Sequence, residues 1–308
     1  MQTFPYTLVF LAALLTSAVV HAAPQSLRRD RVTTLSPSEL SGLAPFTQFA
    51  RAAYCPSDKV QGWNCGEACD AVPGFNLTLT GGDGNEIQLF YVGYWPDQKT
   101  VVVAHEGTDP TELMSDLTDV NIVTEKPDAT LFPGLPDDIT VHSGFADEHK
   151  KTAGTILTEV QNLLSANNAK SVTLVGHSLG GALAELDSLF MVLNLPGDIS
   201  VQAVTYGTPR VGNGAWAAFF DSKVPNFKRV NNEKDIVPIV PGRFLGFAHP
   251  HGEIHIVSPG DAVSCPGDDD ADDDQCTIKT VPNIADGDVL DHLGPYEGIY
   301  IGTLFCDS

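Results

Sequence analysis

The sequence is poor in basic residues and, beyond its first two dozen positions, lacks long apolar runs. No later stretch approaches the roughly 18 apolar residues of a membrane-spanning helix, which excludes a polytopic membrane protein. The chain has 17 Lys and Arg against 39 Asp and Glu, giving a net charge of −22. Such a charge repels phosphate backbones, so we expect no nucleic-acid partner and a neutral substrate. A hydrophobic content of 43% excludes disorder of the whole chain and provides for a large core.

The N-terminus also lacks Lys and Arg before an apolar run from Leu8 to Val20. This run is too short to span a bilayer and is followed by small residues, which predicts a signal peptide over 1–22 and a secreted, extracellular protein. A basic cluster, 27–31, then predicts either a pro-segment over 23–31 or a solvated linker. We expect 32–308 to form one domain, since no linker or repeat interrupts it.

Six cysteines in a secreted chain indicate disulfides rather than metal ligands. Proximity in the chain favours pairing Cys65 with Cys69 and Cys265 with Cys276, which leaves Cys55 to pair with Cys306. A single Asn-X-Thr sequon predicts surface glycosylation at Asn76.

Strand and helix patterns alternate along the body of the chain. Short apolar runs predict buried strands over 100–104 and 171–175, the segments 201–206 and 227–230 continue the alternation of strands and helices, and a further strand is predicted over 247–257. Helical spacing predicts helices over 151–167, 182–195 and 216–221. This order predicts an α/β fold with a central, mostly parallel sheet and helices on both faces. Its active site should lie at the carboxyl ends of the strands.

One such strand end carries a Gly-x-Ser-x-Gly pattern over 176–180. A buried strand precedes it and a helix rich in small residues follows, which is the context of a nucleophile elbow. The sharp turn would expose the Ser178 hydroxyl at a helix N-terminus, where developing negative charge is stabilised. We therefore predict Ser178 as a nucleophile.

A serine nucleophile needs a base and a carboxylate. Of the four later histidines, His249, His251 and His255 lie in a strand-like segment and are expected to be structural, whereas His292 lies in a turn-rich segment suited to a general base. Asp235 follows a strand and is the expected carboxylate. The alternatives Asp187, Asp198 and Asp221 lie in or beside helices and are expected to be solvated. The order Ser178, Asp235, His292 is that of α/β-hydrolases.

These residues, with the motifs at 141–145, 206–212, 235–238 and 291–293, resemble the fungal secreted class 3 lipase family, which also contains feruloyl esterases. The resemblance covers most of the chain after Leu40. It implies an α/β-hydrolase fold, the triad Ser178, Asp235 and His292, and an oxyanion hole from Thr108 and Leu179. The family commonly has Arg where this chain has Glu106, so the lid contact of that Arg must differ here.

The resemblance also implies a short helical lid over 109–120. Asp109 and Pro110 suit a helix start, and the apolar residues Leu113, Met114, Leu117 and Val120 share one face. The lid would make transient contact with a lipid interface; the alternative is an ordinary surface helix. The acidic run 267–274 does not fit an EF-hand and is expected to be a solvated loop.

We therefore predict a monomeric, secreted serine carboxylic-ester hydrolase that needs no cofactor or metal. Its substrate is a neutral ester, and the resemblance favours triacylglycerol lipase activity. The alternative is a feruloyl esterase acting on phenolic esters of the plant cell wall, because the lid is short and acidic. A non-catalytic secreted binding protein is a remote alternative.

Overall fold

The computed structural model describes residues 1–2, 31–108, 114–115, 122–269 and 272–306. The signal-peptide core Leu8–Val20, the expected pro-segment up to Asp30, and Asp109, Leu113, Leu117 and Val120 of the expected lid lie outside these residues. Within the described part of the chain, no helix is long and apolar enough to cross a membrane.

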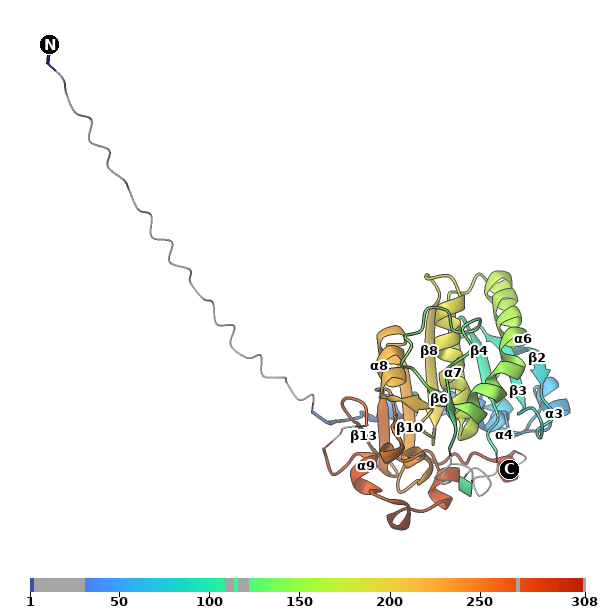
Figure 1. The fold of residues 1–308 in the computed structure, drawn as a ribbon. Helices are drawn as coiled ribbons and strands as arrows, with labels where there is room; N and C mark the ends of the chain where they lie inside the picture. Colours follow the sequence, from blue (N-terminus) through green and yellow to red (C-terminus); the bar gives the residue numbers. More distant parts are fainter. Residues whose placement is uncertain (3–30, 109–113, 116–121, 270–271, 307–308) are drawn as a thin grey trace.

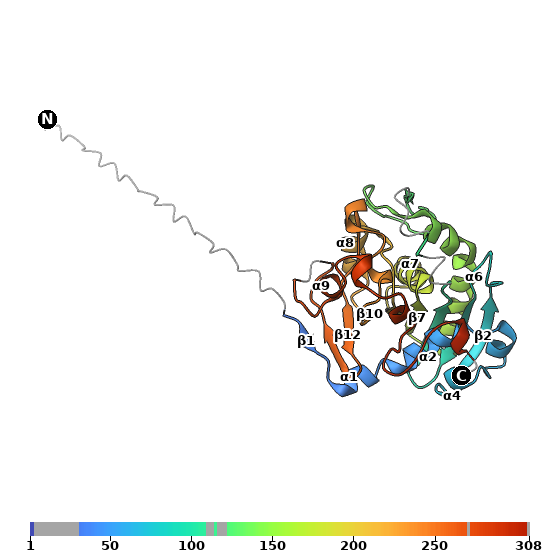
Figure 2. The same cartoon turned by 90° about the horizontal axis from the view of Figure 1, so that it is seen from below.

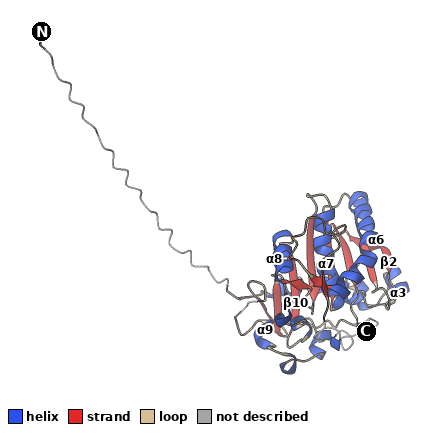
Figure 3. Ribbon diagram, in the orientation of Figure 1, coloured by secondary structure: helices blue, strands red, loops and turns tan. Residues whose placement is uncertain are grey.

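A nine-stranded sheet forms the centre of the molecule, with the order β1-β13-β12-β10-β8-β7-β4-β3-β2. The five central strands, from β12 to β4, are parallel, and antiparallel strands flank them on both sides. The nine strands of this sheet are β1 (Thr33–Thr34), β2 (Asn76–Gly81), β3 (Phe90–Trp95), β4 (Thr100–His105), β7 (Ser171–His177), β8 (Ser200–Tyr206), β10 (Phe227–Asn232), β12 (Glu253–Ser258) and β13 (Asp261–Ser264). The expected mostly parallel sheet is therefore present (Figure 3).

Helices cover both faces of this sheet (Figures 1 and 2). The face covered by the long helices has α6 (Ser143–Asn167), α7 (Leu179–Asn194) and α8 (Gly214–Lys223). The opposite face is covered by the N-terminal helices α1 (Pro37–Ser41), α2 (Ala44–Ala52), α3 (Ser57–Gln61) and α4 (Glu67–Asp70). Further short elements are α9 (Thr277–Thr280) and the 3-10 helices η1 (Val237–Ile239), η2 (Arg243–Leu245), η3 (Ile284–Asp286), η4 (Leu290–Leu293) and η5 (Thr303–Phe305).

The core divides into two clusters because successive side chains of a strand point to opposite faces. Val101 and Val103 of β4 pack with α6 and α7, whereas Val102 and Ala104 pack with α2. Since both faces are covered, the strand is buried along its whole length. This explains why its sequence is a continuous apolar run rather than an alternating one.

A second, four-stranded sheet lies beside the first and has the order β11-β9-β6-β5. Its strands are β5 (Thr124–Glu125), β6 (Val141–His142), β9 (Gly212–Asn213) and β11 (Phe247–Ala248). Three disulfides join Cys55 to Cys306, Cys65 to Cys69 and Cys265 to Cys276, the pairs that chain proximity favours.

Two segments differ from the sequence-based expectation. The single strand over 247–257 is wrong: β11 ends at Ala248, and β12 begins only at Glu253. Pro250 lies between them and has no N–H to donate to a ladder, so the chain turns there and the two strands join different sheets. Helix α6 begins at Ser143, eight residues before the expected start, since the first turns carry polar residues that hide its periodicity.

Candidate active site

Ser178 lies in a sharp turn between β7 and α7. Its backbone angles, φ 61° and ψ −131°, belong to a region that residues with a side chain rarely adopt. Its amide donates to the carbonyl of Tyr206 at 2.9 Å, which ties the turn to the neighbouring strand β8. The hydrogen bond to the sheet therefore stabilises the strained backbone of Ser178. This residue directly precedes helix α7, as the elbow pattern predicts.

Asp235 and His292 come together from segments 57 residues apart. His292 Nδ1 lies 2.9 Å from Asp235 Oδ2, and both side chains are buried. The second oxygen, Oδ1, accepts a hydrogen bond from the Val237 amide at 2.8 Å. An ionised carboxylate can only accept, so His292 donates its Nδ1 proton and keeps a lone pair on Nε2. This is the tautomer that a general base requires.

Ser178 Oγ and His292 Nε2 are both buried and have no hydrogen-bond partner among the described residues. Their segments lie side by side, because the ring of His177 packs on that of His292 with centroids 4.4 Å apart. A buried hydroxyl and a buried imidazole nitrogen that are left unpaired cost stability, which indicates groups kept for chemistry rather than folding.

Gly207 sets how closely β8 approaches the pair of Asp235 and His292. A Cβ at this position would lie 2.6 Å from His292 Nδ1 and 2.8 Å from Asp235 Oδ2. The residue also has a φ of +51°, in the left-handed region. Glycine is therefore required here by both space and backbone conformation.

The expected oxyanion-hole residues are Leu179, which directly follows Ser178, and Thr108, whose neighbour Gly107 packs against Ser178. Leu179 is the first residue of α7, so its amide has no intrahelical acceptor. Thr108 follows the end of β4, and the preceding Gly107 packs so tightly that a Cβ there would lie 2.8 Å from Ser178 Cβ. The structure thus brings the backbone next to Thr108 against the serine.

A buried relay missed by sequence reasoning supports the backbone of His292. Tyr54 hydroxyl and His177 Nδ1 are 2.6 Å apart, and His177 Nε2 lies 2.7 Å from the His292 carbonyl oxygen. Because that carbonyl can only accept, His177 donates from Nε2 and receives the Tyr54 proton at Nδ1. Burial holds the pKa of His177 well below its usual value, so the ring is neutral. Tyr296 donates to the same carbonyl at 3.0 Å.

Glu106, where the family commonly has Arg, is buried and directly follows the last residue of β4. Its Oε2 accepts from the Leu89 amide at 3.1 Å. Burial raises the pKa of its carboxyl to about 7. The next Lys or Arg after it in the sequence is Lys126, so the residues that directly follow it in the chain supply no Lys or Arg charge to it. With its raised pKa, the Glu106 carboxyl titrates near neutrality, and it belongs to the residue directly before Gly107.

Asp187 is not solvated, contrary to expectation, but fully buried. Its two oxygens meet His105 Nε2 at 2.7 Å and His149 Nε2 at 2.9 Å. Although burial by itself raises the pKa of this carboxyl, the two histidine hydrogen bonds lower it below its ordinary value. The cluster joins β4, α6 and α7 behind the elbow. Asp198 is exposed, as expected, and contacts Lys170.

Asp221 and the acidic loop also correct the expectation of solvated carboxylates. Asp221 is half-buried and contacts the ring of His251. In the acidic run, Asp269 is buried and binds the guanidinium of Arg210, and it also accepts from the His249 amide. The run is therefore anchored to the protein through Asp269. Its partners lie far away in sequence, so composition alone indicated a fully solvated loop.

The expected lid is only partly described. Met114 is helical and its side chain packs against the core cluster under α6 and α7, whereas the rest of the expected lid lies outside the described residues, apart from Ser115. Asn76, the predicted glycosylation site, is exposed at the start of the edge strand β2.

Glu253, Cys265 and Cys276 lie close enough together to hold a metal ion. The sulfurs of the two cysteines form a disulfide, however, and offer no thiolate to a metal.

Comparison with known proteins shows which family the chain belongs to. A family model described as lipase (class 3) matches residues 102–245. The secreted mono- and diacylglycerol lipase LIP1 of Malassezia globosa is 31% identical over 260 residues, covering 83% of this chain and 80% of the relative. The chain belongs to the class 3 lipase family. As a member of that family it is a carboxylic-ester hydrolase.

Other lipases are similar over different shares of the chain. MDL2 of Malassezia globosa, also named a secreted mono- and diacylglycerol lipase, is 36% identical over 58% of this chain and 59% of its own length. Lipase II from Rhizopus niveus superposes with a TM-score of 0.76 at 27% identity, over 90% of this chain and all of that one. A triacylglycerol lipase whose catalytic centre is described as a serine protease triad gives 0.77 at 27% identity, with the same shares. The expected α/β-hydrolase fold is confirmed.

Proposed function

We propose that the protein is a secreted lipase that hydrolyses acylglycerols with Ser178, His292 and Asp235 as its catalytic triad. The main support is the pairing of a buried Asp235–His292 hydrogen bond with a strained serine whose hydroxyl is unpartnered. The relatives reported above are named lipases, two of them for mono- and diacylglycerols and one for triacylglycerols. These names favour glycerides over the phenolic esters of a feruloyl esterase.

In the first half-reaction, His292 Nε2 takes the proton of Ser178 as Oγ attacks the ester carbonyl carbon. Asp235 stabilises the imidazolium that forms and holds the ring through Nδ1. The negative charge on the carbonyl oxygen is bound by the Leu179 amide and by Thr108, each such donor being worth about 3 kcal/mol of barrier. His292 then protonates the departing glycerol oxygen, which leaves an acyl-Ser178 enzyme.

In the second half-reaction, water replaces the alcohol. His292 accepts a proton from the water, which attacks the acyl carbon, and the same oxyanion donors bind the second tetrahedral intermediate. Collapse returns the proton to Ser178 and releases a fatty acid. No step requires a metal or a cofactor.

We further propose that the signal peptide over 1–22 directs secretion and that residues 109–120 form a lid. Relatives are named as secreted lipases, and the apolar residues Leu113, Met114, Leu117 and Val120 recur at helical spacing. A lid with this face would cover the pocket in water and turn toward a lipid surface. Removal of a pro-segment over 23–31 also remains a proposal, and mass spectrometry of the secreted protein would give its N-terminus.

The substrate class is tested by comparing hydrolysis of monobutyrin, tributyrin, triolein and methyl ferulate. We expect turnover of the glycerides and little turnover of methyl ferulate. In Ser178→Ala, glyceride turnover should fall by roughly 10⁴-fold or more. Ser188→Ala is a matched control, since Ser188 lies on the same helix and donates only to the Ala184 carbonyl.

Two outcomes would oppose the proposal in different ways. Hydrolysis of methyl ferulate without glyceride hydrolysis would overturn the substrate class. Undiminished glyceride turnover in Ser178→Ala would overturn the mechanism.

A further inference from the structure

Three buried ionisable side chains meet behind the nucleophile elbow and take no part in the proposed mechanism. His105 ends β4, His149 lies on α6 and Asp187 lies on α7, and at most 2% of each side chain is exposed. An ionised carboxylate can only accept, so both rings donate to Asp187 from Nε2. Because well-packed apolar residues in place of buried charged groups are often at least as stable, stability alone does not account for this cluster.

The end of β4 meets one face of α7 at two places. A Cβ at Gly180 would lie 2.3 Å from the His105 carbonyl oxygen and 2.7 Å from that of Glu106, so this backbone packs directly on the first turn of α7. Asp187 follows Gly180 by seven residues, about two helical turns, and therefore lies on the same face of the helix. The hydrogen bond from His105 Nε2 to Asp187 Oδ2, at 2.7 Å, thus holds the strand end at a second point on that face.

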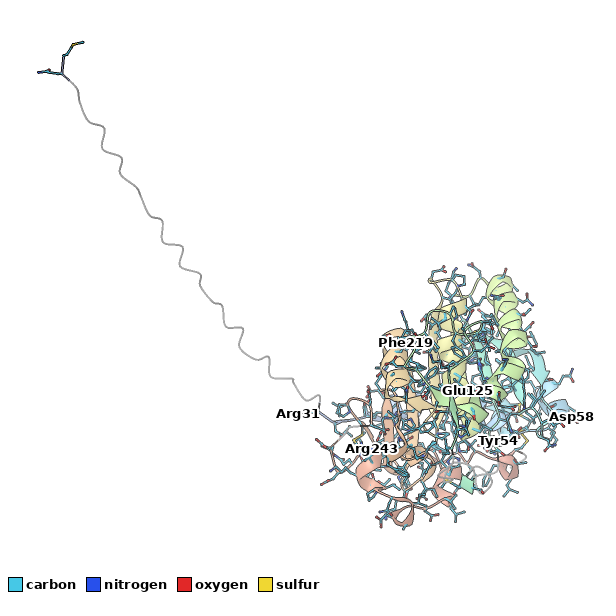
Figure 4. All side chains as sticks on the ribbon, viewed as in Figure 1. Arg31, Tyr54, Asp58, Glu125, Phe219 and Arg243 are labelled. Carbon is cyan, nitrogen blue, oxygen red and sulfur yellow. A yellow bond between two sulfur atoms is a disulfide. The ribbon has the colours of Figure 1, made fainter. Side chains whose placement is uncertain are left out.

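The two expected oxyanion donors belong to these two segments. Leu179 begins α7, and Thr108 follows His105 by three residues. The chain between His105 and Thr108 is tightly packed, because a Cβ at Gly107 would lie 2.3 Å from the hydroxyl of Tyr54, which Figure 4 labels toward the lower end of the molecule. Both donors must reach one oxyanion at about 2.7–3.1 Å. The spacing between the donors therefore depends on where the end of β4 lies along α7.

Packing and hydrogen bonding constrain that position differently. The contact at Gly180 prevents closer approach but allows the strand end to shift along the helix, whereas a hydrogen bond to a carboxylate fixes both distance and direction. Burial by itself raises the pKa of Asp187, but the hydrogen bonds from His105 and His149 hold that pKa below its ordinary value. The carboxylate is thus ionised at neutral pH, which makes the link to His105 a charge-assisted hydrogen bond.

We propose that His105 and Asp187 are positioning residues of the oxyanion hole, because their hydrogen bond fixes Thr108 relative to the Leu179 amide. The proposal rests on the proposed function, since it concerns the oxyanion of that reaction. His149 binds the other carboxylate oxygen at 2.9 Å from α6, which carries neither donor. It therefore supports the fold without setting the spacing of the donors.

The main test is the split between kcat and KM in His105→Leu, measured on p-nitrophenyl butyrate with the full-length secreted enzyme. This change removes the donor but keeps an apolar side chain. We expect kcat to fall about 30-fold, less than the loss of a whole oxyanion donor, while KM changes less than about twofold, because the donors act in the transition state. His105→Gln offers an amide N–H in place of Nε2 and should retain about a third of kcat or more.

His149→Leu is the matched control, because it removes one histidine donor from the same carboxylate. Both leucine variants leave one oxygen of Asp187 without its buried partner, so both should unfold at lower urea concentration than the wild type. We expect kcat of His149→Leu to stay within about twofold of the wild type, since the link of β4 to α7 is intact. Should His105→Leu not fold, His105→Met takes its place, because an unbranched side chain adapts better to the space.

A double-mutant cycle shows whether His105 acts through Thr108. In a Thr108→Ala background, the loss of kcat caused by His105→Leu should shrink to about threefold or less, because the donor that His105 positions is already gone. Independent effects would instead multiply.

Three results would overturn the proposal. These are wild-type kcat in folded His105→Leu, an equal loss of kcat in His149→Leu, and the same loss from His105→Leu with and without the Thr108 side chain. Each of them leaves ester hydrolysis by the wild type, and hence the proposed function, standing. Absence of ester hydrolysis by the wild type would overturn the proposed function and this proposal with it.

Discussion

At the scale of single residues, the chemistry depends on groups that burial has modified. The sequence indicated Ser178 and Asp235 because each follows a predicted strand, and His292 because it lies in a turn-rich segment and completes a characteristic order. It could not indicate Tyr54 or His177 as supports, because hydrogen bonds between residues 123 and 115 positions apart leave no local pattern. Nor could it give the state of Glu106, whose pKa depends on how completely the fold desolvates it.

Glu106 should make activity depend on pH in a way that Glu106→Gln removes. Its carboxyl has a pKa of about 7 in the folded protein and an ordinary value of 4.5. Above pH 7 it is ionised two residues from Thr108 in the chain, and a negative charge there opposes the anionic transition state. We expect the activity of wild type relative to Glu106→Gln to fall by about tenfold between pH 6 and pH 8.5.

The pH dependence of unfolding stability tests the raised pKa of Glu106 a second time. Since folding raises the pKa of Glu106, its contribution to stability is complete below pH 4.5 and is lost as pH rises through 7. Denaturant unfolding should therefore show Glu106→Gln gaining stability over wild type as pH rises from 5 to 8. Glu86→Gln, at an exposed position, is the control. If the ratio of wild-type to Glu106→Gln activity stayed constant between pH 6 and pH 8.5, the pKa assigned to Glu106 would be contradicted.

Tyr54→Phe should impair catalysis by loosening the support of His292. The change leaves His177 Nδ1 without its buried partner, and an unsatisfied buried group costs about 1–3 kcal/mol. We expect kcat on a soluble butyrate ester to fall about tenfold with little change in KM. Tyr91→Phe is the matched control, since that buried hydroxyl donates to the Phe49 carbonyl away from the site. Equal kcat losses in both variants would indicate a general structural effect.

At the scale of elements, the order of strands and helices was predictable, whereas their ends and their polar contacts were not. The apolar runs located β4 and β7 because burial on both faces leaves a continuous pattern, and the alternation of strands and helices then located β8 and β10. The first turns of α6 escaped prediction, since they carry polar residues. Asp187 was misjudged because its histidine partners belong to other elements, and helical position alone suggests a solvated carboxylate.

Asp187→Asn should destabilise the junction of β4, α6 and α7. The change removes the buried anion that accepts from His105 and His149, and breaking a buried charged cluster costs about 3–5 kcal/mol. Asp198→Asn removes an exposed carboxylate and should change stability little. Urea unfolding measures both. Equal stability of the two variants would mean that the buried cluster contributes nothing to the fold.

At the scale of the whole molecule, one disulfide links the two ends of the domain. Cys55 and Cys306 are 251 residues apart, and Cys55 directly follows Tyr54 of the histidine relay. The pairing followed from chain proximity of the other four cysteines. How it bears on the active site could be learned only from the fold, which places Tyr54 against His177.

Removing this disulfide should cost more than removing a local one. Loop-closure entropy assigns about 5 kcal/mol to the link of Cys55 with Cys306 and about 2 kcal/mol to that of Cys65 with Cys69, four residues apart. The two double Cys→Ala variants should differ accordingly in denaturant unfolding. Similar losses would show that native-state contacts, rather than chain closure, dominate.

The central claim is that Ser178, activated by His292 and Asp235, is the nucleophile. It is tested by reacting the protein with a p-nitrophenyl alkylphosphonate in detergent and mapping the adduct by mass spectrometry. We predict one stoichiometric adduct on Ser178, formed at least 10³-fold more slowly in His292→Ala and in Asp235→Asn. An adduct on another residue, or wild-type labelling rates in His292→Ala, would contradict the account.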